Sequence, residues 1–137
     1  MAHFAKIENG IVTEVIVAEQ DFIDEWHSDE TWVQTSYNTQ CGIHYQSDEI
    51  RDEQNRKIPS TDQSKALRGN FAGIGMVYDS VKDKFYYSQP YASWTLNQTT
   101  WVWDAPLTDP SSGTDIYSWN EDAYQADNST GWELIGD

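Results

Sequence analysis

Two runs of β-prone residues separated by an Asn-Gly pair constrain the fold of this chain more than any other feature. The runs are residues 4–8 and 11–17, and the pair between them is Asn9 and Gly10. Asn and Gly tolerate the positive φ angles of a two-residue type I′ turn, whose twist matches that of the flanking strands. The sequence therefore predicts an antiparallel β-hairpin at the N-terminus.

A short helix is expected after this hairpin. Asp21 is a residue type that caps helix N-termini, and Phe22, Ile23 and Trp26 follow at spacings that would bring them to one face. The pattern supports one or two turns and no more. Residues 32–37 and 42–45 are then predicted to be strands, because they are rich in β-branched and aromatic residues.

Residues 46–65 form a polar run without a periodic apolar face, and its charges of both signs nearly cancel. We expect a long exposed loop. Loops longer than about 12 to 15 residues are uncommon in compact domains unless they bind something or are disordered. The run is therefore either a contact arm or a solvated insertion. The glycine-containing residues 66–75 have the wrong spacing for a phosphate-binding loop and predict a glycine-kinked strand or crossover.

Three later segments repeat one pattern, in which aromatic or apolar residues flank a turn that begins at Asp or Asn. Side-chain acceptors of these types help to close turns, so each segment predicts a strand, a turn and a strand. Residues 132–135 are expected to be the return strand of the last unit. The segments are residues 76–87, 94–103 and 117–124, with turns at Asp79, Asn97 and Asn120.

These patterns predict a mainly β fold, in which antiparallel hairpins form a small sandwich or barrel-like module with at most one short helix. Three segments are expected along the chain. Residues 1–47 form a hairpin lobe with the short helix, residues 48–65 form the polar loop, and residues 66–137 form an aromatic-rich hairpin module.

The charge balance restricts the partners of the chain. Its 137 residues include 23 acidic and 8 basic side chains, which give a formal net charge of −15. Such a surface repels nucleic acid and anionic membranes. The N-terminus lacks the pattern of a signal peptide, and no apolar run approaches the roughly 18 residues of a membrane span, so we expect a soluble protein.

The last part of the chain is both acidic and rich in aromatic residues. No lysine or arginine occurs from residue 85 onward, yet five of the seven tryptophans lie there. Strand alternation predicts that Trp101 and Trp103 share one face. Rings of this kind form cores and protein interfaces, and they also stack on sugar rings. The candidate interface or glycan contacts are Tyr91, Trp94, Trp101, Trp103 and Trp119.

No arrangement of side chains specifies a reaction, so no catalytic residue, cofactor or metal site is predicted. Cys41 and His44 would face opposite sides of a strand, and the single cysteine cannot form an intramolecular disulfide. Four further groups have the side chains but not the spacing of a metal or acid–base site. These groups are the three histidines, the pairs Asp48-Glu49 and Asp52-Glu53, Asp109 with Asp115, and Asp79 with Asp83.

Four blocks of the chain carry a resemblance: residues 1–7 together with 9–12 and 15–17, residues 32–39, residues 66–75 and residues 90–96. They resemble small proteins encoded by marine tailed bacteriophages, notably those of cyanobacteria. The resemblance implies a phage origin and a virion part, and it brings no catalytic residues with it. The chain departs from the family at Cys41-Gly42, where a small or glycine pair is usual, and the stretches after Tyr45 and before Trp132 are variable.

Three functional hypotheses follow. The first is a virion structural protein, such as a capsid decoration or cement subunit or a head or tail appendage, that contacts major capsid or tail proteins and further copies of itself. The second is an adhesin-like module that binds host glycans through Trp101, Trp103 or Tyr91. The third is an assembly chaperone, which would be absent from purified particles.

Overall fold

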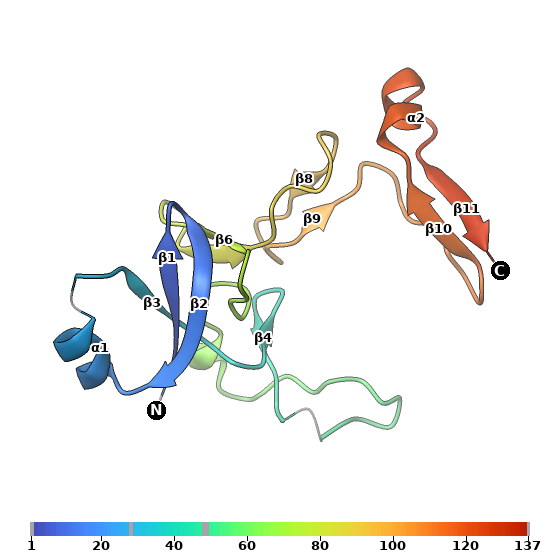
Figure 1. The fold of residues 1–137 in the computed structure, drawn as a ribbon. Coiled ribbons are helices and arrows are strands. Elements are labelled where there is room, and N and C mark those ends of the chain that lie inside the picture. Colours follow the sequence, from blue (N-terminus) through green and yellow to red (C-terminus); the bar gives the residue numbers. More distant parts are fainter. Residues whose placement is uncertain (1, 28, 48–49, 137) are drawn as a thin grey trace. The chain divides into compact units, whose positions relative to one another are not determined.

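The computed structural model describes residues 2–27, 29–47 and 50–136. Within these ranges the chain is mainly β, with antiparallel strands and two short α-helices (Figure 1). The described strands form one five-stranded sheet and three two-stranded ribbons, and the sheet is open rather than closed into a barrel. The mainly β, antiparallel fold class predicted from the sequence is confirmed.

The contacts divide the chain into two compact units. The first unit contains residues 1–88 and 97–102, and the second contains residues 89–96 and 103–137. The boundaries of these units differ from those of the three segments expected from the sequence. The division differs because a hairpin from the aromatic-rich part of the sequence joins the N-terminal sheet.

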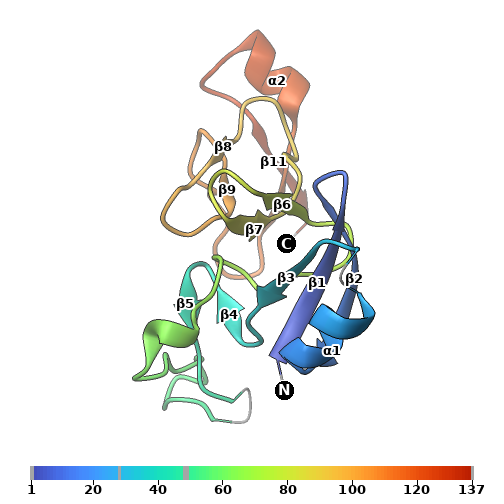
Figure 2. The same ribbon diagram turned by 90° about the vertical axis from the view of Figure 1, so that its left-hand side faces the viewer.

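The five-stranded sheet of the first unit has the order β3-β1-β2-β6-β7. Strands β1, β2 and β3 lie side by side in Figures 1 and 2, and β6 and β7 complete the sheet. The single residue pair Ile11↔Val77 joins β2 to β6. The strands are β1 (Ala2–Glu8), β2 (Ile11–Ala18), β3 (Trp32–Thr35), β6 (Val77–Asp79) and β7 (Lys84–Tyr86).

The predicted N-terminal hairpin is confirmed. Asn9 and Gly10 have φ angles of 54° and 78° between β1 and β2, as a type I′ turn requires. The register shifts by one residue between Lys6 and Ile7. Because a bulge changes the alternation of side chains, Val12 and Val15 both reach the same hydrophobic cluster.

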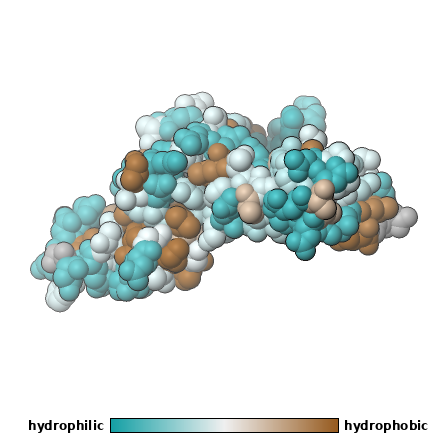
Figure 3. All heavy atoms as spheres, turned by 90° about the horizontal axis from the view of Figure 1, so that it is seen from above, coloured by the Kyte–Doolittle hydropathy of each residue, from teal (hydrophilic) through white to brown (hydrophobic). Residues whose placement is uncertain are grey.

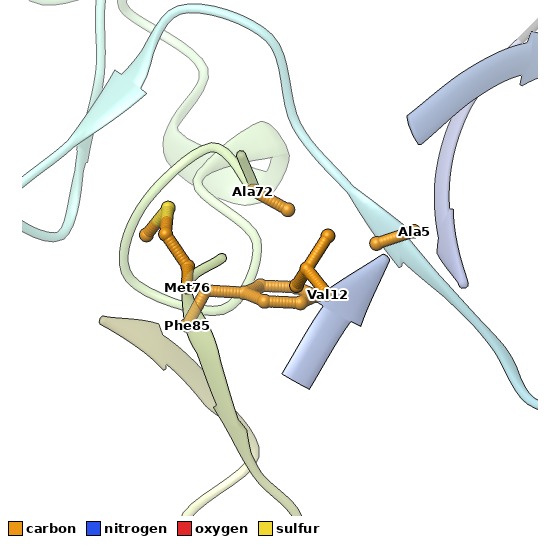
Figure 4. Packing of buried hydrophobic residues seen from close by; sticks show 5 residues of the cluster. All are labelled: Ala5, Val12, Ala72, Met76 and Phe85. Atoms are coloured by element: carbon orange, nitrogen blue, oxygen red, sulfur yellow. The ribbon is translucent and has the colours of Figure 1, made fainter. Parts of the chain in front are cut away.

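This cluster is the main core of the first unit. Ala5, Val12, Ala72, Met76 and Phe85 are each at most 2% exposed and point toward one another (Figure 4). Residues 66–76 supply two of these side chains and contain no strand. Of the two predicted alternatives, the structure therefore has the crossover and not the glycine-kinked strand. The backbone N–H of Ala72 donates to Thr35 Oγ1 (2.9 Å), which fixes the crossover to β3.

Helix α1 (Gln20–Trp26) packs Ile23 against Phe4 and Ala18 in a second cluster. The predicted cap at Asp21 is wrong, because the N-cap is Glu19, two residues earlier, and it makes no side-chain hydrogen bond. The predicted apolar face is buried at only one of its three residues. In a helix of two turns only Ile23 points at the sheet, while Phe22 and Trp26 are 43% and 69% exposed.

The polar loop is tied down at several points in its described part. Strands β4 (Thr39–Gln40) and β5 (Ile43–His44) precede it, and the short 3₁₀ helix η1 (Gln63–Lys65) ends it. Isolated bridges join Tyr45 to Pro59 and Arg51 to Lys57. The predicted loop is thus largely irregular backbone with local order. The pair Asp48-Glu49 lies outside the described residues.

The β6–β7 hairpin is closed by paired tyrosine and aspartate side chains. Asp79 Oδ1 accepts the backbone N–H groups of Val81 and Lys82 (both 3.0 Å), which confirms its predicted role in the turn. Asp79 Oδ2 also accepts from the hydroxyl of Tyr86 (2.7 Å). Burial and the hydrogen bond to the Asp79 carboxylate raise the pKa of Tyr86 to about 12.

The second unit is built from two ribbons and a helix. Strands β8 (Thr95–Leu96) and β9 (Trp103–Asp104) form one ribbon, as the segment 94–103 predicts. Strands β10 (Ile116–Trp119) and β11 (Trp132–Gly136) form the other, which confirms the predicted return strand, and helix α2 (Glu121–Ala126) joins them (Figure 1). Asn120 accepts from the Ala123 N–H (3.0 Å) as the helix cap, so a helix stands where a turn was expected.

Candidate functional site

A cluster of three tryptophans organises the second unit. The register of β10 and β11 places Trp119 directly opposite Trp132, and their ring centroids lie 5.2 Å apart at 73°. Trp94 contacts both, at 5.9 Å from Trp119 and 6.1 Å from Trp132. Tilted and edge-to-face contacts of this kind are the favoured geometries of aromatic pairs. The cluster therefore holds the β10–β11 ribbon to the chain that precedes β8.

Polar groups fix the orientation of these rings. Glu121 Oε1 accepts from Trp119 Nε1 (2.9 Å) and from Ser93 Oγ (2.6 Å), and Glu121 Oε2 accepts from Gln125 Nε2 (2.7 Å). These hydrogen bonds, that of Ser93 first, lower the pKa of Glu121. Trp132 Nε1 donates to the carbonyl oxygen of Leu107 (2.9 Å). The cluster is thus positioned by a charged acceptor and by backbone.

An open groove of about 420 Å³ lies beside this cluster within the second unit. Three tryptophan side chains and two carboxylates line it, together with the chain that follows β9. Its tryptophans are half-buried and its aspartates are exposed. The lining residues are Trp94, Trp103, Asp104, Ala105, Pro106, Leu107, Thr108, Asp109 and Trp132.

The structure brings four of the five predicted contact residues together. Trp94 and Trp103 line the groove, and Tyr91, which is 37% exposed, packs on Trp94 with a centroid distance of 5.4 Å. Trp119 is only 8% exposed, so it belongs to the core and supports the groove from within.

Trp101 does not join this group. Its φ angle is 58°, which takes it out of β9, so the predicted shared face of Trp101 and Trp103 is wrong. The side chain lies in the first unit, where Lys84 Nζ sits 5.4 Å from the ring centroid. The Trp101 carbonyl oxygen accepts from Asn70 Nδ2 (2.9 Å), which anchors this conformation.

Sequence reasoning missed Trp132, Asp104 and Asp109 as groove residues. Trp132 carried a usable signal, because pairing of its strand with residues 117–119 places it opposite Trp119. The two aspartates carried none, since their approach to the tryptophans depends on the path of residues 104–109. Asp109 Oδ1 accepts from the hydroxyl and backbone N–H of Ser111 (2.5 and 2.8 Å), and these bonds lower the Asp109 pKa.

One end of the β10–β11 ribbon exposes apolar side chains. Ile116, Leu134 and Ile135 are 56%, 57% and 64% exposed. On the face seen in Figure 3, hydrophobic residues form several separate groups among hydrophilic ones. A two-stranded ribbon with exposed apolar residues has two unpaired edges available for contacts.

A second hollow, of about 510 Å³, lies in the first unit. His3, Tyr37, Ser64 and Lys65 are among its lining residues. The His3 ring stacks on Tyr37 with a centroid distance of 5.6 Å. Unlike the groove of the second unit, this hollow has no carboxylate among its lining residues.

The groups considered for chemistry have local structural partners. Cys41 occupies a turn with a φ angle of 53°, and its N–H donates to Asn70 Oδ1 (2.9 Å), while His44 Nδ1 lies 2.8 Å from Ser60 Oγ. Asp79 and Asp83 each accept from a tyrosine hydroxyl. Within the described residues no group of three or more His, Cys, Asp or Glu side chains could hold a metal ion.

Among the described residues, no helix has the length and apolar character needed to cross a membrane. Comparisons with protein-family models, with curated proteins and with solved structures gave no match. The phage origin that the sequence resemblance implies therefore stays a prediction.

Proposed function

We propose that this protein is a non-enzymatic structural component of a bacteriophage particle, either a capsid decoration or cement subunit or a small head or tail appendage. It acts through protein–protein contacts with major capsid or tail proteins and with other copies of itself. The phage assignment rests on the resemblance of four sequence blocks. The mode of action rests on the surface of the second unit.

The observation that carries the mode of action is the exposed apolar end of the β10–β11 ribbon. Ile116, Leu134 and Ile135 are all more than half exposed on one short ribbon. Exposed apolar side chains beside unpaired strand edges are typical of surfaces that a partner protein covers. At the other end of the same ribbon, hydrogen bonds hold the rings of Trp119 and Trp132 to Glu121 and to the Leu107 carbonyl oxygen.

The test is mass spectrometry of gradient-purified phage particles, with the copy number of this chain scaled to the major capsid protein. A ratio near one supports capsid decoration, and a few copies per particle support a vertex, neck or tail part. Absence from the particles contradicts the proposal and leaves the assembly chaperone as the explanation.

A host-glycan adhesin is the second candidate, and the groove of the second unit favours it. Trp94, Trp103 and Trp132 could stack on sugar rings, with Asp104 and Asp109 accepting hydroxyl hydrogen bonds. The expected result for an adhesin is binding on a glycan array that Trp103→Ala abolishes and Trp101→Ala leaves intact. The two variants differ because Trp101 lies in the first unit.

A further inference from the structure

The hollow of about 510 Å³ in the first unit is lined by residues of β1, β3 and η1 and of the turn after β3. Its volume lies within the range of small-molecule sites, about 300–1,000 Å³. His3 of β1 is paired with Thr35 of β3 in the sheet, and the Thr39 hydroxyl of β4 donates to the Lys65 carbonyl oxygen of η1 (3.4 Å). The walls of the hollow are therefore held together by the sheet and by contacts of η1.

The polar side chains at the hollow fall into two groups. Three hydroxyl groups form hydrogen bonds within the protein, those of Thr35, Ser36 and Ser64. The polar ends of four other lining side chains make no hydrogen bond or ion pair with any residue that the structure describes. These four are His3, Gln34, Tyr37 and Lys65. Imidazole, amide, hydroxyl and ammonium groups can all donate hydrogen bonds, so the hollow presents four potential donors to a ligand.

The charge of the hollow is set by Lys65, because no carboxylate is among its lining residues. The carboxylate nearest to Lys65 along the chain is that of Asp62, which accepts the backbone N–H and the hydroxyl of Ser64 (3.0 and 2.5 Å). These two bonds are the first causes of the lowered pKa of Asp62, ahead of the charge of Lys65. A cation among hydrogen-bond donors is complementary to an anion that accepts hydrogen bonds.

An aromatic face adds a second requirement for the ligand. The Tyr37 side chain is 53% exposed, and its ring stacks on His3 with a centroid distance of 5.6 Å and an interplanar angle of 17°. The edge-to-face contact with Phe71, at 5.4 Å and 86°, fixes the same ring from another direction. A ring that is supported in this way and still half exposed offers a flat apolar surface, on which the apolar face of a sugar ring can stack.

We propose that this hollow binds a sugar ring that carries a carboxylate, as in a uronic acid. Lys65 provides the counter-charge of the carboxylate, Tyr37 stacks on the apolar face of the sugar, and His3 and Gln34 donate to its oxygen atoms. This inference does not depend on the virion assignment. The site belongs to the first unit, whereas the groove considered for a glycan adhesin belongs to the second.

The combination of a cation and a ring decides between the possible occupants. A phosphate ion or an acidic peptide side chain would use Lys65 and leave the exposed Tyr37 ring uncovered. A neutral sugar would cover the ring and leave the ammonium without a counter-charge, whereas a carboxylated sugar uses both groups. The formal net charge of −15 repels long polyanions, so the ligand that fits best is a single acidic sugar unit.

The test is a titration of the full isotope-labelled chain with methyl glucuronide, followed in amide NMR spectra at neutral pH. Methyl glucoside, in which a hydroxymethyl group replaces the carboxylate, is the matched neutral probe. We expect saturable shifts at residues 3, 34–37 and 64–67, and binding of the glucoside that is weaker by about fivefold, as for an exposed ion pair. Equal binding of the two sugars, or no saturable shift at these residues, overturns the proposal.

Two substitutions of exposed or half-buried lysines test the counter-charge. Lys65→Gln should weaken the glucuronide about fivefold and leave the glucoside unchanged. Lys82→Gln, between β6 and β7, removes the same charge from the first unit at a residue that does not line the hollow, and it should change the affinity by less than about twofold. An equal loss in both variants would mean nonspecific attraction and would overturn the proposal.

The aromatic face is tested by Tyr37→Leu, with Tyr37→Phe as its matched control and the amide spectrum as the check on folding. Loss of the ring should weaken the glucuronide more than loss of the hydroxyl alone, and an equal loss would overturn the stacking contact.

Inorganic phosphate and N-acetylglutamate amide are the probes for the other anionic occupants. Both should bind more weakly than the glucuronide, because neither has a sugar ring to cover Tyr37. Equal or tighter binding of either probe at residues 34–37 and 64–67 would overturn the sugar assignment. The particle experiment is independent of this titration, so its outcome alone decides the virion assignment.

Discussion

Single residues decide where the aromatic rings go. Trp101 follows strand-prone residues, yet its φ angle of 58° places it in the left-handed region, which costs a bulky residue about 1–2 kcal/mol. Distant partners offset that cost. The Trp101 carbonyl accepts from Asn70, and Lys84 lies over the ring. Trp101, which strand alternation would place on the same face as Trp103, therefore lies in the first unit.

Gly131 shows the same dependence on a distant ring. A Cβ atom at this position would overlap the six-membered ring of Trp119, while a Cβ at Gly73 would meet only Met76 Sδ at an ordinary 3.5 Å. Overpacking of this kind costs typically about 1–3 kcal/mol. We expect Gly131→Ala to lower the free energy of unfolding by that amount in urea titrations followed by circular dichroism. Gly73→Ala is the control, and an equal effect of the two variants would contradict the explanation.

At the scale of elements, the β6–β7 hairpin depends on ionised aspartates. Asp83 Oδ1 accepts from the Tyr78 hydroxyl (2.5 Å) and from Arg68 Nε (2.8 Å), and these bonds, that of Tyr78 first, lower the Asp83 pKa. Arg68 also donates to the Gln34 carbonyl oxygen (3.0 Å) on β3. The hairpin is thus linked through one carboxylate to the opposite edge of the sheet.

Because the folded-state pKa of Asp83 is lowered, its contribution to stability is present above the unfolded pKa of about 3.9 and is lost as pH falls through the folded value. Asp83→Asn should therefore destabilise the protein at pH 7, by about 1 kcal/mol or less for so exposed a pair. The difference should vanish at pH values below the folded pKa. Asn also accepts the left-handed φ of 57° at this position, which isolates the charge effect.

Urea unfolding of both proteins at pH 7, 4 and 2.5 measures this dependence. Tyr78→Phe removes the first donor and should reproduce part of the effect at pH 7. A constant difference between wild type and Asp83→Asn across the three pH values would show that the charge of Asp83 does not stabilise the hairpin.

The tryptophan cluster offers a matched pair of substitutions. Trp119 Nε1 donates to Glu121, whereas the buried Trp94 Nε1 has no acceptor among the residues that the structure describes. Phenylalanine removes the indole N–H at either position. Trp119→Phe should therefore lower the free energy of unfolding by about 1 kcal/mol more than Trp94→Phe, the typical net value of one hydrogen bond. Urea midpoints measure this, and a larger loss at Trp94 would contradict it.

At the scale of the whole molecule, the two units have unequal means of stabilisation. The first has a five-stranded sheet and two clusters of buried residues. The second has two-stranded ribbons, which are only marginally stable in isolation. Among its described residues, Trp119 is the only large apolar side chain that is buried. Its order rests on ring contacts and a few side-chain hydrogen bonds rather than on a sheet.

Native-state hydrogen exchange should resolve this difference. We expect amides of β1 and β2 to exchange with the largest opening free energy and those of β10 and β11 with a smaller one, because regions with fewer buried apolar contacts open locally. Mass spectrometry of peptides after timed exchange in D₂O compares the β1–β2 hairpin with the β10–β11 ribbon. Equal protection of both units would show that they unfold as one cooperative body.

Local signals predicted the elements that local forces control. The Asn9-Gly10 pair determined a type I′ hairpin, because only that turn suits two consecutive positive φ angles. Asp79 determined the β6–β7 turn through its own backbone hydrogen bonds. The candidate site was only partly predictable, since Trp94 and Trp103 carried the aromatic signal while Asp104 and Asp109 had no spacing that linked them to it.

The sequence by itself determined the β class of this protein, its turns at Asn9-Gly10 and Asp79 and the absence of lysine and arginine from residue 85 onward, because turn propensity and composition act within a few residues. Only the tertiary structure decided that Trp101 and Trp103 lie in different units, that Trp119 belongs to the core and that Trp132 lines the groove with Trp94. Each of these outcomes depends on contacts between residues far apart in the chain. Long-range packing therefore overrides strand alternation wherever a distant partner holds a ring.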